Sequence, residues 1–107
     1  MNSSDSAAQQ NKTVYGLLSL CRKAGRIRSG GQVLYDCIAS GEAKLVLIAA
    51  DASENTKKKC RDKCTYRDIP WIIFGDMEQL GRATGENDRA AVAVTDAGLA
   101  RTILAKL

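Results

Sequence analysis

The stretch AKLVLIAA, residues 43–50, is a continuous apolar run that only Lys44 interrupts. A run of this length is too short for a helix and is typical of a strand that other elements cover on both faces. We therefore expect a central, buried strand here. Outward from it, the apolar runs at 71–74 and 90–94 predict two more strands, and the alternation Arg26-Ile27-Arg28 predicts a very short fourth strand.

Amphipathic segments with helix-end signals separate these strands. Apolar residues at helical spacing predict a first helix from about Asn11 to Gly25. The pattern Ser29-x-x-Gln32 predicts a capping box that opens a second helix ending at Gly41. Helices that alternate with buried strands indicate an α/β protein, a three-layer α/β/α sandwich with a small mixed sheet of about four strands. The remaining helices are expected to begin near Asp51–Glu54, at Asp76 and at Asp96.

Length and charge limit the functional classes. The 107 residues suit a single domain over 11–107, preceded by a polar, disordered or fraying leader at 1–10. Sixteen Lys and Arg against twelve Asp and Glu give a formal net charge of +4, which favours a polyanionic partner. No apolar run is long enough to cross a bilayer, and no secretory pattern is present, so we expect a cytoplasmic protein without a membrane partner. In that compartment the four cysteines are expected to remain reduced.

The junction before the second helix has the clearest chemical signal. Gly30 and Gly31 lack the side chains that would keep an anion away from the unpaired N–H groups of a helix start. Four basic residues precede the glycines with no acidic residue among them: Arg22, Lys23, Arg26 and Arg28. Two interpretations remain open, an anion-binding helix end and an ordinary solvated turn. A nucleotide loop is less favoured, because neither a P-loop ending nor a GxGxxG spacing is present.

Other polar clusters have simpler explanations. The basic residues from Lys57 to Arg67 predict a solvated face of the third helix. Cys60 and Cys64 lie one helical turn apart, but structural zinc usually needs four ligands and the chain has no histidine, so we favour core packing. No serine or cysteine has an evident base, and most carboxylates lie at helix starts. We therefore expect no catalytic residue, no metal and no cofactor.

Three segments of the chain match a known family: LLSLCRKAGRIRSG (17–30), GEAKLVLIAADASENTKKKCRDKC (41–64) and LGRATGENDRAAVAVTDAGLA (80–100). By these segments the chain resembles the kink-turn RNA-binding ribosomal protein superfamily (the large-subunit "seven-Ae" and "thirty-e" type), and most closely its bacterial YlxQ-like branch. The resemblance implies a non-enzymatic protein that binds ribosomal or other structured RNA, with ribosomal proteins as further candidate partners. It also implies that a sharply bent RNA meets the start of the second helix and the loops at 51–53 and 89–91.

The physical signals and the resemblance point to the same surface. We expect Arg26, Arg28 and Lys44 to contact phosphates around the helix start. The candidate RNA-binding residues are Arg26, Arg28, Ser29, Gly30, Gly31, Gln32, Lys44, Asp51, Ala52, Ser53, Arg89, Ala90 and Ala91.

The chain departs from the family pattern at three positions. Archaeal members typically place Asn, Glu and Lys where this chain has Gln32, Val33 and Asp36. The Gln32 amide can still donate and accept, whereas Val33 accepts no hydrogen bond and Asp36 repels phosphate. These last two residues motivate an alternative, a protein-interaction module on the same fold that has lost specific RNA recognition. A third hypothesis, an enzyme or a metal-dependent redox protein, requires a bound metal or a reactive thiol.

Overall fold

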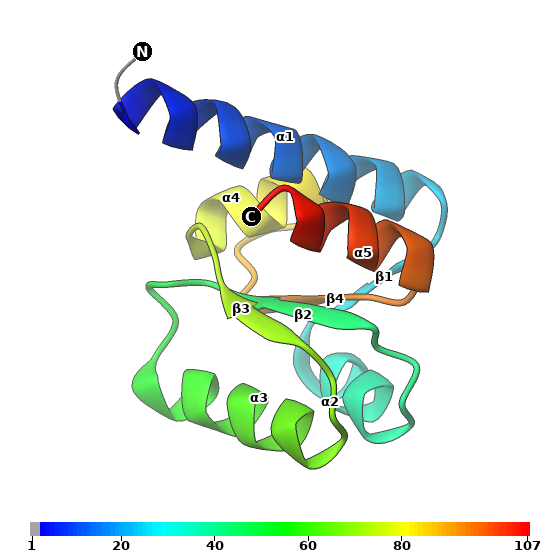
Figure 1. The fold of residues 1–107 in the computed structure, drawn as a ribbon. Coiled ribbons are helices and arrows are strands. Elements are labelled where there is room, and N and C mark those ends of the chain that lie inside the picture. The colour runs from blue at the N-terminus through cyan, green and yellow to red at the C-terminus, as the bar shows by residue number, and fades with distance from the viewer. Residues whose placement is uncertain (1–2) are drawn as a thin grey trace.

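The computed structural model describes residues 3–107, and the sheet of the described chain lies between two helical layers. Helices α1, α4 and α5 cover one face of the sheet, and α2 and α3 cover the other (Figure 1). The prediction of a three-layer α/β/α sandwich is confirmed. The elements are α1 (Ser3–Lys23), β1 (Ile27–Ser29), α2 (Gly31–Ala39), β2 (Leu45–Ile48), α3 (Glu54–Tyr66), β3 (Trp71–Ile73), α4 (Met77–Ala83), β4 (Ala91–Val94) and α5 (Ala97–Ala105).

The sheet is mixed and has the strand order β1-β4-β2-β3. Strand β4 is antiparallel to both of its neighbours, and β2 is parallel to β3, so β4 alone runs opposite to the other three strands. Every residue of the inner strands β2 and β4 is buried, which explains the unbroken apolar run in the sequence. As a result, β1 and β2 end at the same edge of the sheet at which β4 begins.

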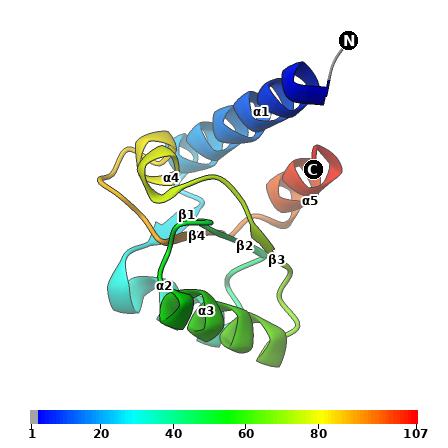
Figure 2. The ribbon, with the colours of Figure 1, turned by 90° about the vertical axis from the view of Figure 1, so that its left-hand side faces the viewer.

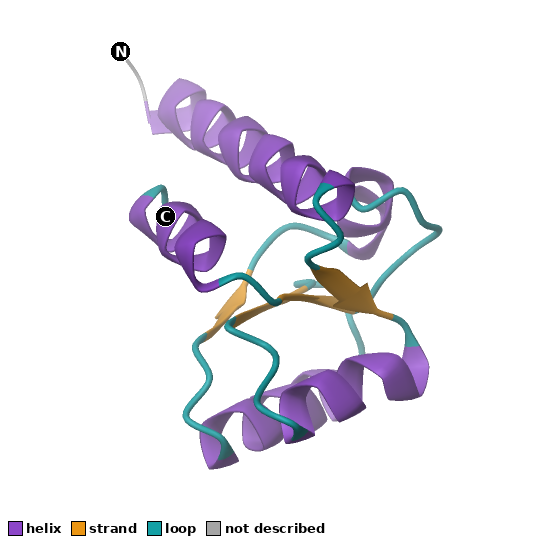
Figure 3. Ribbon diagram, turned by 90° about the vertical axis from the view of Figure 1, so that its right-hand side faces the viewer, coloured by secondary structure: helices purple, strands orange, loops and turns teal. Residues whose placement is uncertain are grey.

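The sheet separates the two helical layers (Figures 2 and 3). Each face of the sheet supports its own hydrophobic core. Leu45 and Leu47 belong to the core under α1, α4 and α5, whereas Val46 belongs to the core over α2 and α3, as the two-residue period of a strand requires. Cys60 and Cys64 of α3 are fully buried in this second core. The core-packing interpretation of both cysteines is therefore confirmed.

Helix starts agree with the sequence at three of the five helices that the structure describes. The side chains of Ser53, Asp76 and Asp96 cap α3, α4 and α5 by accepting a hydrogen bond from the N–H group three residues further on. Helix α1 begins at Ser3, inside the segment for which a leader is expected. Neither glycine nor proline occurs between residues 3 and 15, so the helix can extend backward from its packed turns.

Membrane crossing requires a helix that is both long and apolar. Among residues 3–107, no helix has this combination.

Candidate nucleic-acid interface

Two glycines form the turn between β1 and α2. Gly30 has φ 87° and ψ 113°, and Gly31 has φ 54°. A side chain in this left-handed region costs about 1–3 kcal/mol, so the turn depends on glycine. Gly30 is the N-cap residue of α2, and no side chain bonds to the first N–H groups of this helix.

The predicted capping box Ser29-x-x-Gln32 is wrong. Ser29 is still part of β1, where it pairs with Val92, and its hydroxyl accepts a hydrogen bond from Nε of Arg89 at 3.1 Å. The Gln32 side chain turns forward along α2 and donates to Oδ1 of Asp36 at 2.9 Å. Both side chains therefore have partners that compete with the helix start, and a local four-residue pattern does not reveal those partners.

The start of α2 consequently differs from the starts of α3, α4 and α5. It has no side-chain cap, and, as at the start of α5, its first turn contains no acidic residue. Unpaired N–H groups and the partial positive charge of the helix dipole both attract negative charge. An anion or the acceptor edge of a base can therefore bind at the start of α2.

The loops at 51–53 and 89–91 lie at the same edge of the sheet as this turn. The N–H group of Ala49 donates to the carbonyl of Ala90 at 2.8 Å, and Ile48 pairs with Ala91. We call residues 29–32, 51–53 and 89–91 the glycine edge. The structure thus brings together ten of the thirteen residues that the sequence singled out.

The side chains of the 51–53 loop serve the fold. Oδ1 of Asp51 accepts a hydrogen bond from the N–H group of Met77 at the start of α4, at 2.9 Å. Ala52 is buried in the core, and the Ser53 hydroxyl caps α3. This loop can therefore offer a ligand mainly its backbone.

Arg89 is the cation of the glycine edge. Besides its bond to Ser29, its Nη2 pairs with Glu86 at 3.2 Å, and its side chain is 26% exposed. A Cβ added to Gly30 would lie 3.5 Å from the Arg89 guanidinium carbon, so the guanidinium lies directly beside the glycine turn. The loop that leads to Arg89 packs closely against Gly81 of α4, where an added Cβ would collide with the backbone of Asn87.

A hollow opens between the starts of α2, α3 and β4. Tyr35 and Thr56 line it, and the sequence did not single out either residue. The ammonium groups of Lys59 and Lys63 lie 4.1 and 5.6 Å from the centroid of the Tyr35 ring. The sequence carries one signal for this arrangement, the helical spacing of Thr56, Lys59 and Lys63, but it does not show that this side of α3 faces α2. The full lining is Gly30, Gly31, Leu34, Tyr35, Thr56, Asp88, Arg89, Ala90 and Ala91.

Three expected phosphate contacts do not gather at the glycine edge. The carbonyl of Arg26 accepts from Thr95, and the N–H group of Lys44 donates to Val94, so both residues lie near the opposite edge, where β4 ends. Arg28 lies in β1, and its Nη2 pairs with Glu42 at 3.5 Å. Strand direction separates Arg26 and Lys44 from the glycine edge, and the pair with Glu42 engages the guanidinium of Arg28.

The thiols of the described chain have the properties of buried groups. Burial raises the pKa of Cys37 to about 11 and the pKa of Cys64 to about 12, so both thiols stay protonated near neutral pH. Among the side chains that the structure describes, no group of three or more Cys, Asp or Glu residues is placed to hold a metal ion. The chemistry that the glycine edge can perform is binding through hydrogen bonds and charge.

Comparison with known families and sequences gives consistent matches. Residues 12–104 match the ribosomal protein L7Ae/L30e/S12e/Gadd45 family. The RNA-binding protein YlxQ of Bacillus subtilis (strain 168) is 40% identical over 93 residues, which cover 87% of this chain and 93% of that protein. The RNA-binding protein YlxQ of Enterococcus faecium is 33% identical over 85 residues, which cover 79% of this chain and 82% of that protein.

Solved structures show the same fold. A Bacillus halodurans protein described as having unknown function matches with a TM-score of 0.82 at 34% identity, covering 87% of this chain and 94% of its own. The Giardia lamblia 15.5kD RNA binding protein matches with a TM-score of 0.73 at 19% identity, covering 92% of this chain and 91% of its own. At that identity the second match supports the fold alone.

Proposed function

Because the chain belongs to the ribosomal protein L7Ae/L30e/S12e/Gadd45 family, we propose that it is a cytoplasmic RNA-binding protein whose glycine edge receives a structured, kink-turn-like RNA. The family and the sequence relatives carry the names of ribosomal and RNA-binding proteins, not of enzymes. The observation that supports this site is the uncapped start of α2, which lies in a hollow beside the guanidinium of Arg89.

Each part of the glycine edge has a role in this proposal. The open N–H groups at the start of α2 donate to base edges or to phosphate oxygens that a sharp bend in the RNA exposes. The exposed Gln32 amide keeps an oxygen free to accept from a base, while its nitrogen donates to Asp36. The small residues Gly30 and Ala90 let the RNA approach the backbone closely.

Positive charge at this edge comes from Arg89 and from α3, and not from the residues before the turn. The ammonium groups of Lys59 and Lys63 lie over the ring of Tyr35, which lines the hollow. Ribosomal RNA and other structured RNAs both supply the phosphates that these cations would neutralise. Arg26, Arg28 and Lys44 would then contribute to the general field of the protein more than to direct contacts.

A second candidate function is protein recognition, which one exposed side chain favours. Val33 lies in the first turn of α2 and is 53% exposed, beside a shallow surface that Arg28 and Asp36 also line. A protein partner that covered Val33 would bury apolar area, and such binding depends little on salt.

A titration separates these two functions. The protein is titrated against a fluorescent kink-turn RNA and against a straight duplex of equal length, at 50 and 200 mM salt, conditions between which phosphate-dominated binding weakens steeply. We expect tighter binding to the bent RNA at both salt concentrations, with affinity falling as salt rises. Equal affinity for both RNAs would contradict recognition of the bend, and absence of binding to either RNA would contradict the RNA-binding function itself.

A further inference from the structure

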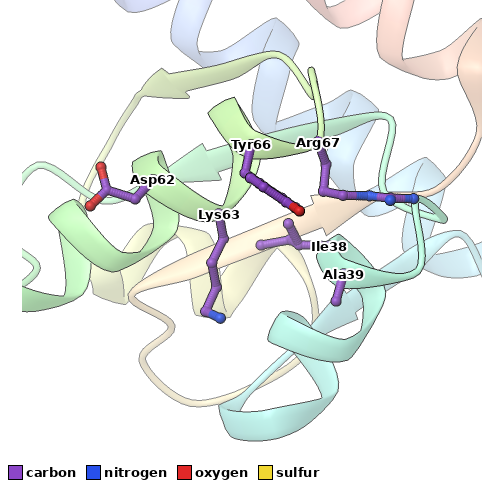
Figure 4. A pocket seen from close by; sticks show the side chains of 6 residues that line it. All are labelled: Ile38, Ala39, Asp62, Lys63, Tyr66 and Arg67. Atoms are coloured by element: carbon purple, nitrogen blue, oxygen red, sulfur yellow. The ribbon is translucent and has the colours of Figure 1, made fainter.

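A groove runs between α2 and α3 away from the glycine edge, and Lys63 is the one lining residue that the proposed function already uses. Its volume is about 380 Å³, which falls in the range of roughly 300–1,000 Å³ typical of ligand sites. Tyr66, at the end of α3, is 86% exposed, an unusual exposure for an aromatic side chain. Figure 4 shows Tyr66 and Arg67 of the α3 end beside Ile38 and Ala39 of α2, with Asp62 pointing away from them.

Basic residues recur at a regular spacing along the side of α3 that leads into this groove, where Lys63 and Arg67 line it and Lys59 lies one helical turn before them. Lys59, Lys63 and Arg67 are four residues apart, so they lie on one side of α3 and span about 12 Å along its axis. None of the three forms an ion pair with a carboxylate among the described side chains. The acidic residue of the groove, Asp62, pairs with Lys58 at 2.8 Å, which offsets its charge.

The groove is continuous with the glycine edge. Tyr35 lines the hollow beside Gly30, and the ammonium group of Lys63 lies 5.6 Å from the centroid of its ring. Lys63 also lines the groove together with Tyr66 and Arg67. A single track of alternating aromatic and basic side chains therefore leads from the start of α2 to the end of α3.

We propose that the α2–α3 groove binds a single-stranded RNA segment that flanks the structured RNA on the glycine edge, with Tyr66 as a stacking platform for a base and Lys63 and Arg67 as phosphate contacts. This inference rests on the proposed function, because the flank continues the same RNA molecule. Proteins bind single-stranded nucleic acid through exposed aromatic rings beside unpaired cations, because every base has a face that can stack and every nucleotide carries a phosphate. An apolar protein segment would leave the three cations without partners.

The test compares RNAs that differ only in the flank. Fluorescence anisotropy measures affinity for a blunt kink-turn RNA and for the same RNA with an unpaired extension of about eight nucleotides at its 5′ or its 3′ end. We expect one extension to increase affinity about 5-fold or more, the effect of stacking one base. Tyr66→Ala should remove most of that gain and leave the affinity for the blunt RNA unchanged.

Charge is tested with a matched pair of double variants. Lys63→Ala/Arg67→Ala should lower the salt slope for the extended RNA by about 1.4, because each phosphate contact to a single strand contributes about 0.7. The same variant should lower the slope for the blunt RNA less, because Arg67 contacts only the flank. Arg101→Ala/Lys106→Ala removes the same charge from α5 and its C-cap, on the opposite face of the sheet, and should lower the slope less.

The outcomes separate this inference from the proposed function. If the blunt RNA binds but neither extension adds affinity, the groove inference is overturned and the glycine edge stands. The inference is also overturned if Tyr66→Ala leaves the gain from the extension intact. If no kink-turn RNA binds, the proposed function fails and the groove inference fails with it.

Discussion

Replacing Gly30 with alanine perturbs the turn that opens α2 without disturbing its neighbours. The new Cβ would lie 3.5 Å from the nearest atom, the guanidinium carbon of Arg89, which is an ordinary van der Waals contact. The cost therefore comes from the backbone, because φ at this residue is 87° and alanine avoids that region. Such a conformation costs about 1–3 kcal/mol, and the lower entropy of the unfolded alanine chain offsets about 0.4–1 kcal/mol of it.

The expected net loss in the free energy of unfolding is about 1–2 kcal/mol, or a Tm lower by about 4–8 °C for a domain of this size. Thermal and urea unfolding, followed by circular dichroism, measure it. Gly16→Ala is the matched control: Gly16 is exposed inside α1, has no positive φ and no atom within 4 Å of the added Cβ, so this variant should gain about 1 kcal/mol. Equal free energies of unfolding for the Gly30→Ala variant and the wild-type protein would contradict the left-handed backbone conformation of Gly30.

Three further changes probe the charges and thiols. Arg89→Ala should weaken binding of kink-turn RNA and lower the free energy of unfolding by about 1 kcal/mol. The control Arg82→Ala removes an exposed cation of α4 and should change RNA affinity little. Equal loss of affinity in both variants would contradict a direct RNA contact by Arg89. Asp36→Asn should raise RNA affinity about 2- to 5-fold in anisotropy titrations, because it removes a negative charge beside Gln32, and unchanged affinity would place the phosphates elsewhere. Stability should fall between pH 9 and 12, since the pKa of Cys64 is about 12 in the folded protein against 9.0 ordinarily, so the unfolded thiol loses its proton first. At pH 10 this amounts to about 1.4 kcal/mol for that thiol, and urea unfolding of a Cys64→Ala variant should show a correspondingly flatter pH dependence.

The layers of the fold were predictable because a strand that is buried on both faces has an unbroken apolar sequence. The unbroken run around Leu45–Ile48 could be recognised as an inner strand from composition alone, and the caps at Ser53, Asp76 and Asp96 act within their own turns. The family resemblance, read from three short segments, is likewise confirmed by the match over residues 12–104.

The details of the candidate site were harder to predict because they depend on contacts between distant segments. Arg89 lies sixty residues from Ser29 in sequence and takes the hydroxyl that a capping box would need. Lys44 directly precedes β2, and the strand directions place it near the opposite edge of the sheet from the glycines. Lys59 and Lys63 of α3 are exposed, as a solvated face predicts, but the sequence did not show that they lie over Tyr35 of α2.

The most direct test of the central claim is to map the RNA on the backbone amides of the protein. Titration of ¹⁵N-labelled protein with kink-turn RNA should shift or broaden the amide signals of Gly31, Gln32 and Val33 most strongly, together with Ala90 across the hollow. Unchanged signals at the start of α2, with the largest shifts on α5 or on the outer strand β3, would contradict the assignment of the glycine edge as the RNA-binding surface.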